Sequence, residues 1–107
     1  MIVIVFRSTL LPGVLDKYVT EVERMSELAT TMPGYISHKS FSADDGERVT
    51  VAEFETKEGL RTWRMNPEHR EAQRKACEIY YSSYSVQVCE MKRESKFDRN
   101  ALGNAAE

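Results

Sequence analysis

A run of adjacent apolar residues at the start of the chain constrains the fold most strongly. Five such residues follow one another with no polar residue between them: Ile2, Val3, Ile4, Val5 and Phe6. Successive side chains of a β-strand point to opposite faces, so a strand of this composition is buried on both faces. We therefore expect a strand over residues 1–10 at the centre of a sheet, with a covering layer on each side.

An amphipathic helix is predicted after the first break in the chain. Pro12 and Gly13 end the strand. Apolar residues then recur at steps of three and four, at Leu15, Tyr18, Val22, Met25 and Leu28. This spacing gives a helix one apolar face. The run at 32–34, Met-Pro-Gly, ends the helix because Pro cannot continue it and Gly turns easily.

The middle of the chain is typical of a β-hairpin followed by a short helix. Strands are predicted over residues 35–42 and 48–54, with Asp-Asp-Gly at 44–46 as the turn between them. Thr56 is a suitable N-cap for a short helix that runs through Leu60 and Trp63.

The last third of the chain predicts one more helix and one more strand. Asn66 is a good N-cap, and Pro67 suits the first helical position, where its missing N–H costs nothing. The expected inner stripe of this helix consists of Ala72, Ala76, Ile79 and Tyr80. A strand over residues 84–91 alternates apolar and polar residues.

The order of these elements, β-α-β-β-α-β, predicts an α+β domain of the ferredoxin-like kind. Both helices would cover one face of a four-stranded antiparallel sheet whose first and third strands are central. The two-sided burial of the first strand then leaves the second face to be covered. Two sheets packed face to face would cover it, so we expect a homodimer with a barrel-like interior. The domain should span residues 1–94, and the tail 95–107, which has no periodicity, should fray.

Composition excludes several classes of function. The 107 residues suit one domain, and the formal net charge of -2, with mixed signs along the chain, argues against a nucleic-acid partner. Cys77 and Cys89 are too few for a disulfide framework and are not spaced as a zinc site, so we interpret them as small buried apolar residues. No apolar stretch approaches the roughly 20 residues that span a bilayer, and the first strand lacks the features of a signal peptide. A cytoplasmic location is the expectation by default.

Several short segments resemble the antibiotic biosynthesis monooxygenase family. They are the Met-Pro-Gly-Tyr run at 32–35, the strand at 49–54, Trp63, and the Pro-Glu-His-Arg run at 67–70. The resemblance covers roughly residues 1–93. It implies a dimeric α+β barrel with a pocket in each subunit between the sheet and the helices. Some members of this family are cofactor-free oxygenases that act on polycyclic phenols, anthrones or quinols, whereas others bind and break haem.

The haem-degrading branch fits this chain poorly. Its members carry an Asn near the end of the first strand and a haem-ligating His further along the helix after the Trp. Here the strand carries Arg7 and Ser8, and Ala72 and Gln73 lie nine and ten residues beyond Trp63. We therefore expect no haem and no other cofactor, and we keep a haem protein as the least favoured alternative.

His69 is the first candidate for a catalytic residue. It falls in the first turn of its helix and shares a face with Ala72, Gln73 and Ala76. The positive end of the helix dipole disfavours imidazolium there, and a neutral imidazole is a base near neutral pH. The competing interpretation is a structural histidine that bonds a backbone carbonyl. Trp63, by resemblance, would form a flat wall of the pocket and offer an indole N–H, although simple core packing explains it too.

Four further side chains complete the predicted site. Arg7 follows the apolar strand and could reach into the pocket to stabilise an anion, or it could mark the exit of the strand into solvent. His38 could face the pocket or the dimer interface. Gln73 and Tyr80 are predicted to contact the substrate, although tyrosines such as Tyr80 are more often core residues.

The leading functional hypothesis is a cofactor-independent monooxygenase. The substrate would be an electron-rich phenol, quinol or anthrone, and dioxygen the second reactant. His69 would remove a proton, and Arg7 and Trp63 would stabilise charge. A binding module without catalysis on the same fold is the second hypothesis.

Overall fold

The computed structural model describes residues 1–100 of the chain, and it contains four strands and three helices in this part. In chain order these are β1 (Ile2–Leu10), α1 (Leu15–Ala29), β2 (Tyr35–Ser42), β3 (Arg48–Phe54), α2 (Lys57–Met65), α3 (Pro67–Ile79) and β4 (Tyr81–Glu90). The predicted elements are confirmed, and both hairpin strands have the expected bounds. The last strand begins three residues earlier than predicted, at Tyr81.

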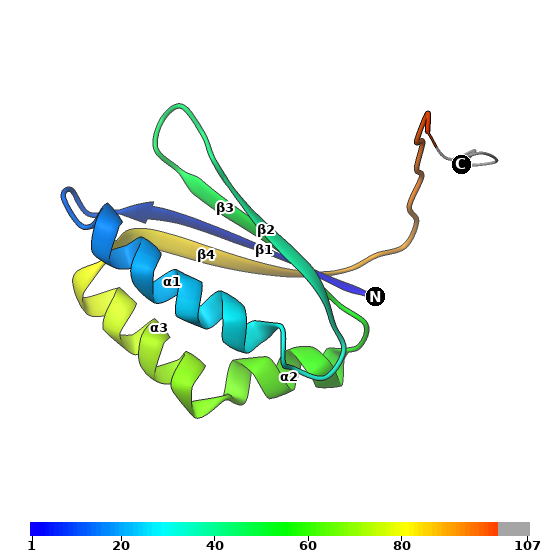
Figure 1. Ribbon diagram of the computed structural model, residues 1–107, viewed down its shortest axis with the longest axis horizontal. Coiled ribbons are helices and arrows are strands. Elements are labelled where there is room, and N and C mark those ends of the chain that lie inside the picture. Colours follow the sequence, from blue (N-terminus) through cyan, green and yellow to red (C-terminus); the bar gives the residue numbers. More distant parts are fainter. Residues whose placement is uncertain (101–107) are drawn as a thin grey trace.

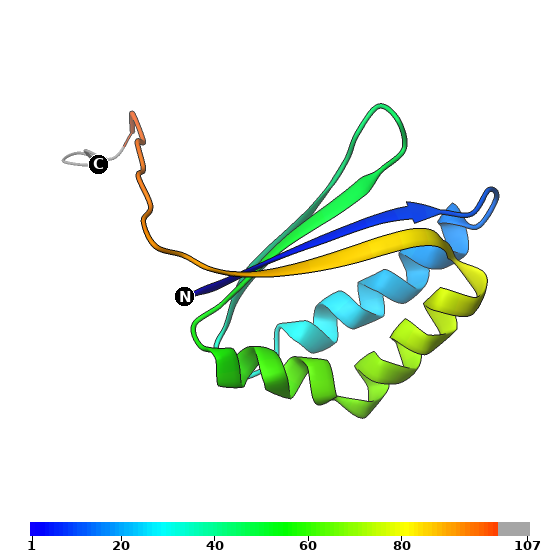
Figure 2. The same ribbon diagram turned by 180° about the vertical axis from the view of Figure 1, so that it is seen from behind.

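The four strands form one antiparallel sheet in the order β2-β3-β1-β4. The prediction that the first and third strands are central is therefore confirmed. All three helices lie on one side of this sheet, and within residues 1–100 the other side carries no helix (Figure 1, Figure 2). The ferredoxin-like fold is thus present in a single chain.

Strand alternation divides the sheet into a helix-facing side and an open side. On β1 the even-numbered residues face the helices, and Ile2 and Ile4 are buried there. Their neighbours across β3 include Phe54, which is only 2% exposed, and Leu60 of α2 packs on the same group. A second apolar cluster, between α1, α3 and the start of β4, is built around three buried residues: Tyr18, Ala76 and Tyr80.

The open side of the sheet carries a line of apolar side chains. Val3 and Val5 of β1 point to this side, and Val5 lies directly opposite Val51 of β3 in the register. These valines are half-buried by their own sheet neighbours, although no helix covers them. Phe41 of β2, on the same side, is 52% exposed. As predicted, no helix of the described residues covers this face of the sheet.

Two caps and one close contact fix the short helix α2 and the start of α3. The Thr56 hydroxyl accepts a hydrogen bond from the N–H of Gly59 at 3.0 Å, and Asn66 Oδ1 accepts one from the N–H of His69 at 3.1 Å. Both predicted N-caps are confirmed. Gly59 also lies against the loop before β2, where a Cβ atom at its position would be 2.4 Å from the carbonyl oxygen of Pro33. The α1–β2 loop therefore packs directly on the backbone of α2.

Two expectations about burial were wrong. Cys77 and Cys89 are both exposed. Cys89 points to the open side of an edge strand, and Cys77 lies on α3 beside an open space between this helix and the sheet. Ile79 belongs to the predicted inner stripe of α3 but is 42% exposed, because the helix ends there and Tyr80 takes the buried place.

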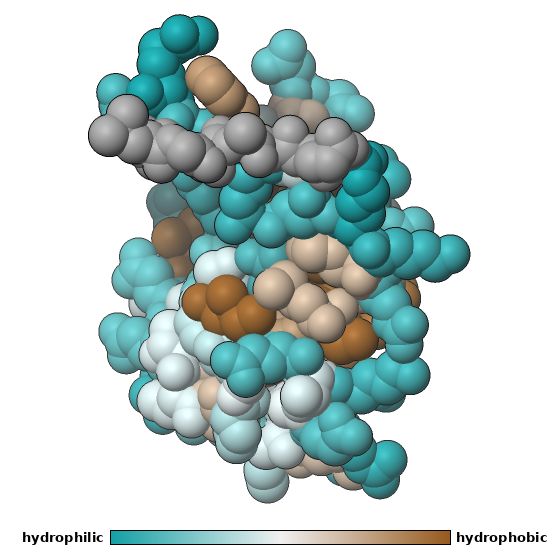
Figure 3. Space-filling view, turned by 90° about the vertical axis from the view of Figure 1, so that its right-hand side faces the viewer, coloured by the Kyte–Doolittle hydropathy of each residue, from teal (hydrophilic) through white to brown (hydrophobic). Residues whose placement is uncertain are grey.

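One end of the molecule is mostly hydrophilic, with a small group of apolar side chains (Figure 3). Within residues 1–100, no helix is both long and apolar enough to cross a bilayer. The cytoplasmic location remains a prediction. Of the predicted tail, residues 95–100 contain no helix or strand, and residues 101–107 lie outside the described part of the chain.

Candidate active site

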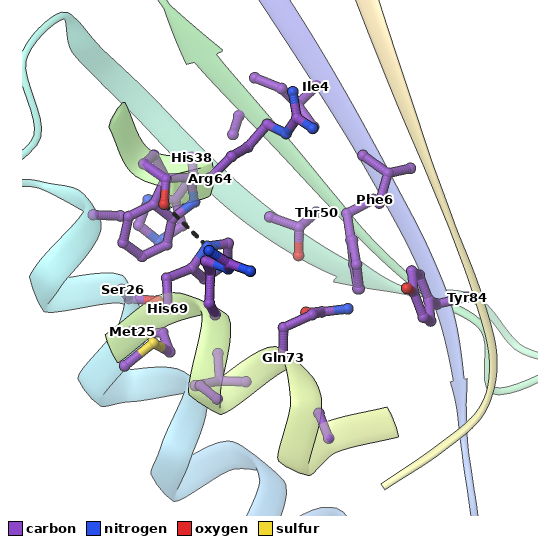
Figure 4. Close-up of a pocket in the computed structure, with 18 of the residues that line it drawn as sticks. Ile4, Phe6, Met25, Ser26, His38, Thr50, Arg64, His69, Gln73 and Tyr84 are labelled. Carbon is purple, nitrogen blue, oxygen red and sulfur yellow. Dashed lines mark hydrogen bonds between the residues drawn. The ribbon is translucent and has the colours of Figure 1, made fainter. Parts of the chain in front are cut away.

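A cavity of about 840 Å³ lies between the helix-facing side of the sheet and the three helices. Apolar and aromatic side chains dominate its walls, and a few polar side chains point into it (Figure 4). The volume and the lining of this cavity are typical of a site that binds a small molecule. Three residues on the helix-facing side of β4 line the cavity and are still about half exposed: Tyr84, Val86 and Val88. The cavity is therefore open along this edge strand.

His69 and Trp63 form one unit in the wall of this cavity. The Nδ1 atom of His69 lies 3.2 Å from the backbone carbonyl oxygen of Trp63, and the imidazole stacks on the indole with ring centroids 3.9 Å apart and an interplanar angle of 19°. A carbonyl oxygen can only accept a hydrogen bond, so Nδ1 carries the proton. The lone pair of Nε2 is then free to accept a proton.

The charge state of His69 follows from its position. The ring is half-buried, and this burial lowers the pKa of His69 below the usual value of 6.5; the hydrogen bond to the Trp63 carbonyl opposes the shift but is the smaller cause. The imidazole is therefore neutral near pH 7. The structure thus combines both interpretations of this histidine, because a ring that bonds a carbonyl also lines the cavity as a neutral base.

His38 lies on β2 and lines the same cavity. Its Nδ1 atom is 2.7 Å from the hydroxyl of Tyr35, and the two rings meet edge to face. When the Tyr35 hydroxyl donates this hydrogen bond, Nε2 carries the proton and is a donor. Of the two predicted positions for His38, the structure therefore shows the pocket and not the open face of the sheet.

Gln73 and Tyr80 also contribute to the cavity wall. Gln73 projects into the cavity from α3, opposite Thr50 of β3 (Figure 4). Tyr80 is only 3% exposed and belongs to the apolar cluster with Tyr18 and Ala76, so most of its surface supports the core. Five of the six predicted site residues thus line one cavity.

Arg7 is the sixth, and its predicted reach into the pocket is corrected by the structure. Odd-numbered residues of β1 point to the open side of the sheet, away from the cavity, and Arg7 is one of them. Its guanidinium forms two hydrogen bonds with the carboxylate of Glu47, at 2.8 and 3.1 Å. This pairing raises the pKa of Arg7 further, so the side chain remains charged and bound on the other face.

Most of the lining residues were not predicted, among them the polar residues Tyr35 and Arg64. Tyr35 lines the cavity and bonds His38, and Arg64 projects into it from α2. A helical pattern does point to Arg64, because it follows Leu60 by four residues and so shares its inward face. Among residues 1–100, no group of three or more His, Cys, Asp or Glu side chains is placed to hold a metal ion.

The fold and this cavity define a ferredoxin-like α+β domain with an aromatic-lined small-molecule pocket. The chain belongs to the antibiotic biosynthesis monooxygenase family, whose sequence model matches residues 1–75. A curated relative, the uncharacterized protein YqjZ of Bacillus subtilis, is 32% identical over 83 residues, which are 78% of this chain and 73% of that protein.

Solved structures show the same fold. Rv0793 from Mycobacterium tuberculosis superposes with a TM-score of 0.79 at 17% identity, over 89% of this chain and 98% of that one. A mutant of SnoaB, a cofactor-independent oxygenase from Streptomyces nogalater, superposes with a TM-score of 0.76 at 14% identity, over 87% of this chain and 94% of that one. The predicted family and the predicted ferredoxin-like fold of the single chain are confirmed, and the dimer remains a prediction.

Proposed function

We propose that this protein is a cofactor-independent monooxygenase that oxidises an electron-rich aromatic small molecule, such as a phenol, quinol or anthrone, with dioxygen. The observation that carries the proposal is the placement of His69. Its ring is neutral, is held in one tautomer by the Trp63 carbonyl, and lines a cavity of about 840 Å³. Membership of the monooxygenase family and the fold shared with a cofactor-independent oxygenase agree with it.

In the proposed reaction, Nε2 of His69 accepts the proton of the aromatic O–H or C–H group. The resulting anion passes one electron to dioxygen, and the two radicals combine to a peroxide. His69 returns its proton to this peroxide. The carbon that carries the peroxide then loses its hydrogen as a proton to His69 while the O–O bond breaks, so one oxygen atom stays on the ring as a carbonyl oxygen. The other leaves as hydroxide, which takes that proton and becomes water. The substrate supplies all the electrons, so the balance needs no other reductant.

Three other side chains are proposed to position the substrate. The His69 imidazole covers one face of the Trp63 indole, and the rest of the indole is proposed to form an aromatic wall of the cavity. The Nε2 atom of His38 and the amide of Gln73 are hydrogen-bonding groups on other walls of the cavity. Tyr80 is proposed to act mainly through packing. Arg7 has no part in this proposal.

We further propose that residues 1–94 form the functional domain and that it works as a homodimer. The apolar open side of the sheet, with Val3, Val5 and Val51, supports this arrangement, because a second copy of the same surface would cover it. The pocket itself lies on the other side of the sheet, between the sheet and the helices of one chain.

Oxygen consumption tests the proposed reaction. Purified protein is mixed with a panel of hydroquinones, naphthols and anthrones, and dissolved oxygen is followed with an electrode. The proposal predicts uptake with at least one compound class and a loss of about 100-fold or more in His69→Ala. Thr62→Ala, an exposed change on α2, is the matched control and should retain the rate.

The outcomes separate the proposed enzyme from its alternatives. Compounds that bind without oxygen uptake would support a binding module, the second function considered above. Uptake that persists in His69→Ala would remove the proposed role of this residue. A haem titration with a shifted Soret band would favour the third alternative, a haem protein.

A further inference from the structure

We propose that Arg64 makes the cavity selective for an aromatic acid, a ring system that carries a carboxylate in addition to the group that reacts. This inference rests on the proposed function, because it assumes that an aromatic molecule occupies the cavity. The inference adds a class of substrate and a specificity-determining residue to that function.

Arg64 is placed to meet a ligand in this cavity. It follows Trp63 on α2, and its side chain extends across the cavity toward Ile4 of β1 (Figure 4). It also lines a neighbouring hollow of about 420 Å³ beside β4. The guanidinium is exposed and makes no hydrogen bond or ion pair with any residue in the described part of the chain. It is therefore available to a ligand.

The charges on the other lining residues leave the cavity positive. Glu21 is neutralised by Lys75, with which it forms an ion pair. Arg74 is held by two carboxylates outside the cavity wall, Glu71 and Glu78, at 2.6 Å each.

Only two charged lining residues then remain without a partner within residues 1–100, and both are arginines: Arg64 and Arg70. The whole chain, in contrast, has a formal net charge of -2. A positive cavity in an acidic protein selects for anionic ligands.

The shape of the cation favours a carboxylate over a point anion. A guanidinium presents two parallel N–H groups that match the two oxygens of a carboxylate. Arg64 directly follows Trp63 on α2 and lines the same cavity as His69, so a ring bound in this cavity can place a carboxylate substituent against the guanidinium while the reacting group faces His69. A neutral analogue with the same rings would leave the guanidinium without a partner.

Two probes with the same ring system test the inference: 2-naphthoate and the neutral 2-naphthalenemethanol. Their dissociation constants are measured by titration calorimetry for the wild type, Arg64→Gln, Arg64→Lys and Arg61→Gln. Arg61 is an exposed arginine on the same helix that does not line the cavity, so Arg61→Gln is the matched control.

The inference predicts that the wild type binds 2-naphthoate about 10-fold more tightly than the alcohol, since a hydrogen bond to a charged group is strong. Arg64→Gln should lose this preference while its affinity for the alcohol stays the same. Arg64→Lys should keep part of the preference, because lysine retains the positive charge but lacks the two parallel N–H groups of the guanidinium. Arg61→Gln should behave as the wild type, and salt should weaken only the binding of 2-naphthoate.

Other results would overturn the inference in distinguishable ways. If the alcohol binds as well as the acid, or if Arg64→Gln keeps the preference, Arg64 does not select an aromatic acid, but the aromatic pocket of the proposed function stands. If the wild type binds neither probe, both the inference and the aromatic pocket on which it rests fail.

Discussion

The Nδ1 atom of His69 lies 3.2 Å from the carbonyl oxygen of Trp63, and the two rings stack with their centroids 3.9 Å apart. The relationship has a simple cause. Trp63 lies in the last turn of α2, and its carbonyl accepts one backbone hydrogen bond, from the capping N–H of Asn66 at 3.2 Å. A carbonyl oxygen has two lone pairs, so this one can also accept a hydrogen bond from a side chain. The chain turns at Asn66, and the first turn of α3 then brings His69 back to this carbonyl. One helix end thereby fixes the orientation of a ring on the next helix.

The first prediction concerns the pH dependence of His69. Burial lowers the pKa of this imidazole below 6.5, so the folded state favours the neutral ring more than the unfolded state does. Between the pKa of the folded state and that of the unfolded state, the unfolded chain binds more protons. The contribution of His69 to the free energy of unfolding is therefore fully present above pH 6.5 and is lost as the pH falls below it. If His69 is the base, the rate should fall on the acid side with the same lowered pKa.

An NMR titration of the imidazole Hε1 proton measures this pKa. The His69 resonance is identified by its absence in His69→Gln. We expect a midpoint clearly below pH 6.5 that matches the acid limb of the rate profile. A midpoint at or above pH 6.5 would contradict the account of the buried neutral ring.

A second prediction concerns the contact between α2 and the α1–β2 loop. In Gly59→Ala the new Cβ would lie 2.4 Å from the carbonyl oxygen of Pro33, so helix and loop must separate. Overpacking costs about 1 to 3 kcal/mol, and the better helix propensity of Ala returns only about 1 kcal/mol. Urea unfolding should therefore show a net loss of up to about 2 kcal/mol in the free energy of unfolding. Arg61→Ala, exposed on the same helix, should change stability by less than about 0.5 kcal/mol; equal stability of both variants would contradict the packing described for Gly59.

The third prediction concerns the open side of the sheet. Val5 lies opposite Val51 in the register and, in the proposed homodimer, faces the second copy. Val5→Glu places a charge in this apolar surface and should shift the protein from the mass of two chains to that of one, 12.3 kDa, in light scattering after size exclusion. Val19→Glu, on the exposed side of α1, should keep the wild-type mass. A wild type that is already monomeric, or a Val5→Glu that remains dimeric with an intact fold, would exclude this interface.

The sequence predicted the elements well because their signals are local. Strand bounds in the hairpin were right because Gly34 and the Asp-Asp-Gly turn at 44–46 limit them, and the caps at Thr56 and Asn66 worked as expected. The apolar run of β1 correctly indicated a central strand.

The apolar run of β1 did not show the direction in which Arg7 points. When a strand is apolar on both faces, its sequence does not show which face points toward the helices. The face on which Arg7 lies therefore follows only from the pairing of β1 with β3 and β4. The partial exposure of Val86 and Val88 could not be predicted either. It depends on β4 being an edge strand, which is decided by how the strands assemble in the sheet. His69 could be predicted to point inward, but its bond to the Trp63 carbonyl depends on the angle between α2 and α3.

Isotope labelling during turnover tests whether the oxygen atom added to the substrate comes from dioxygen. The protein is incubated under ¹⁸O₂ with the compound that gives oxygen uptake, and the product is analysed by mass spectrometry. The account predicts that each product molecule gains one ¹⁸O atom, that the second appears in water, and that His69→Ala forms little labelled product. Product oxygen that comes from the solvent, or labelled product formed equally by His69→Ala, would contradict the claim that this cavity is a monooxygenase site with His69 as its base.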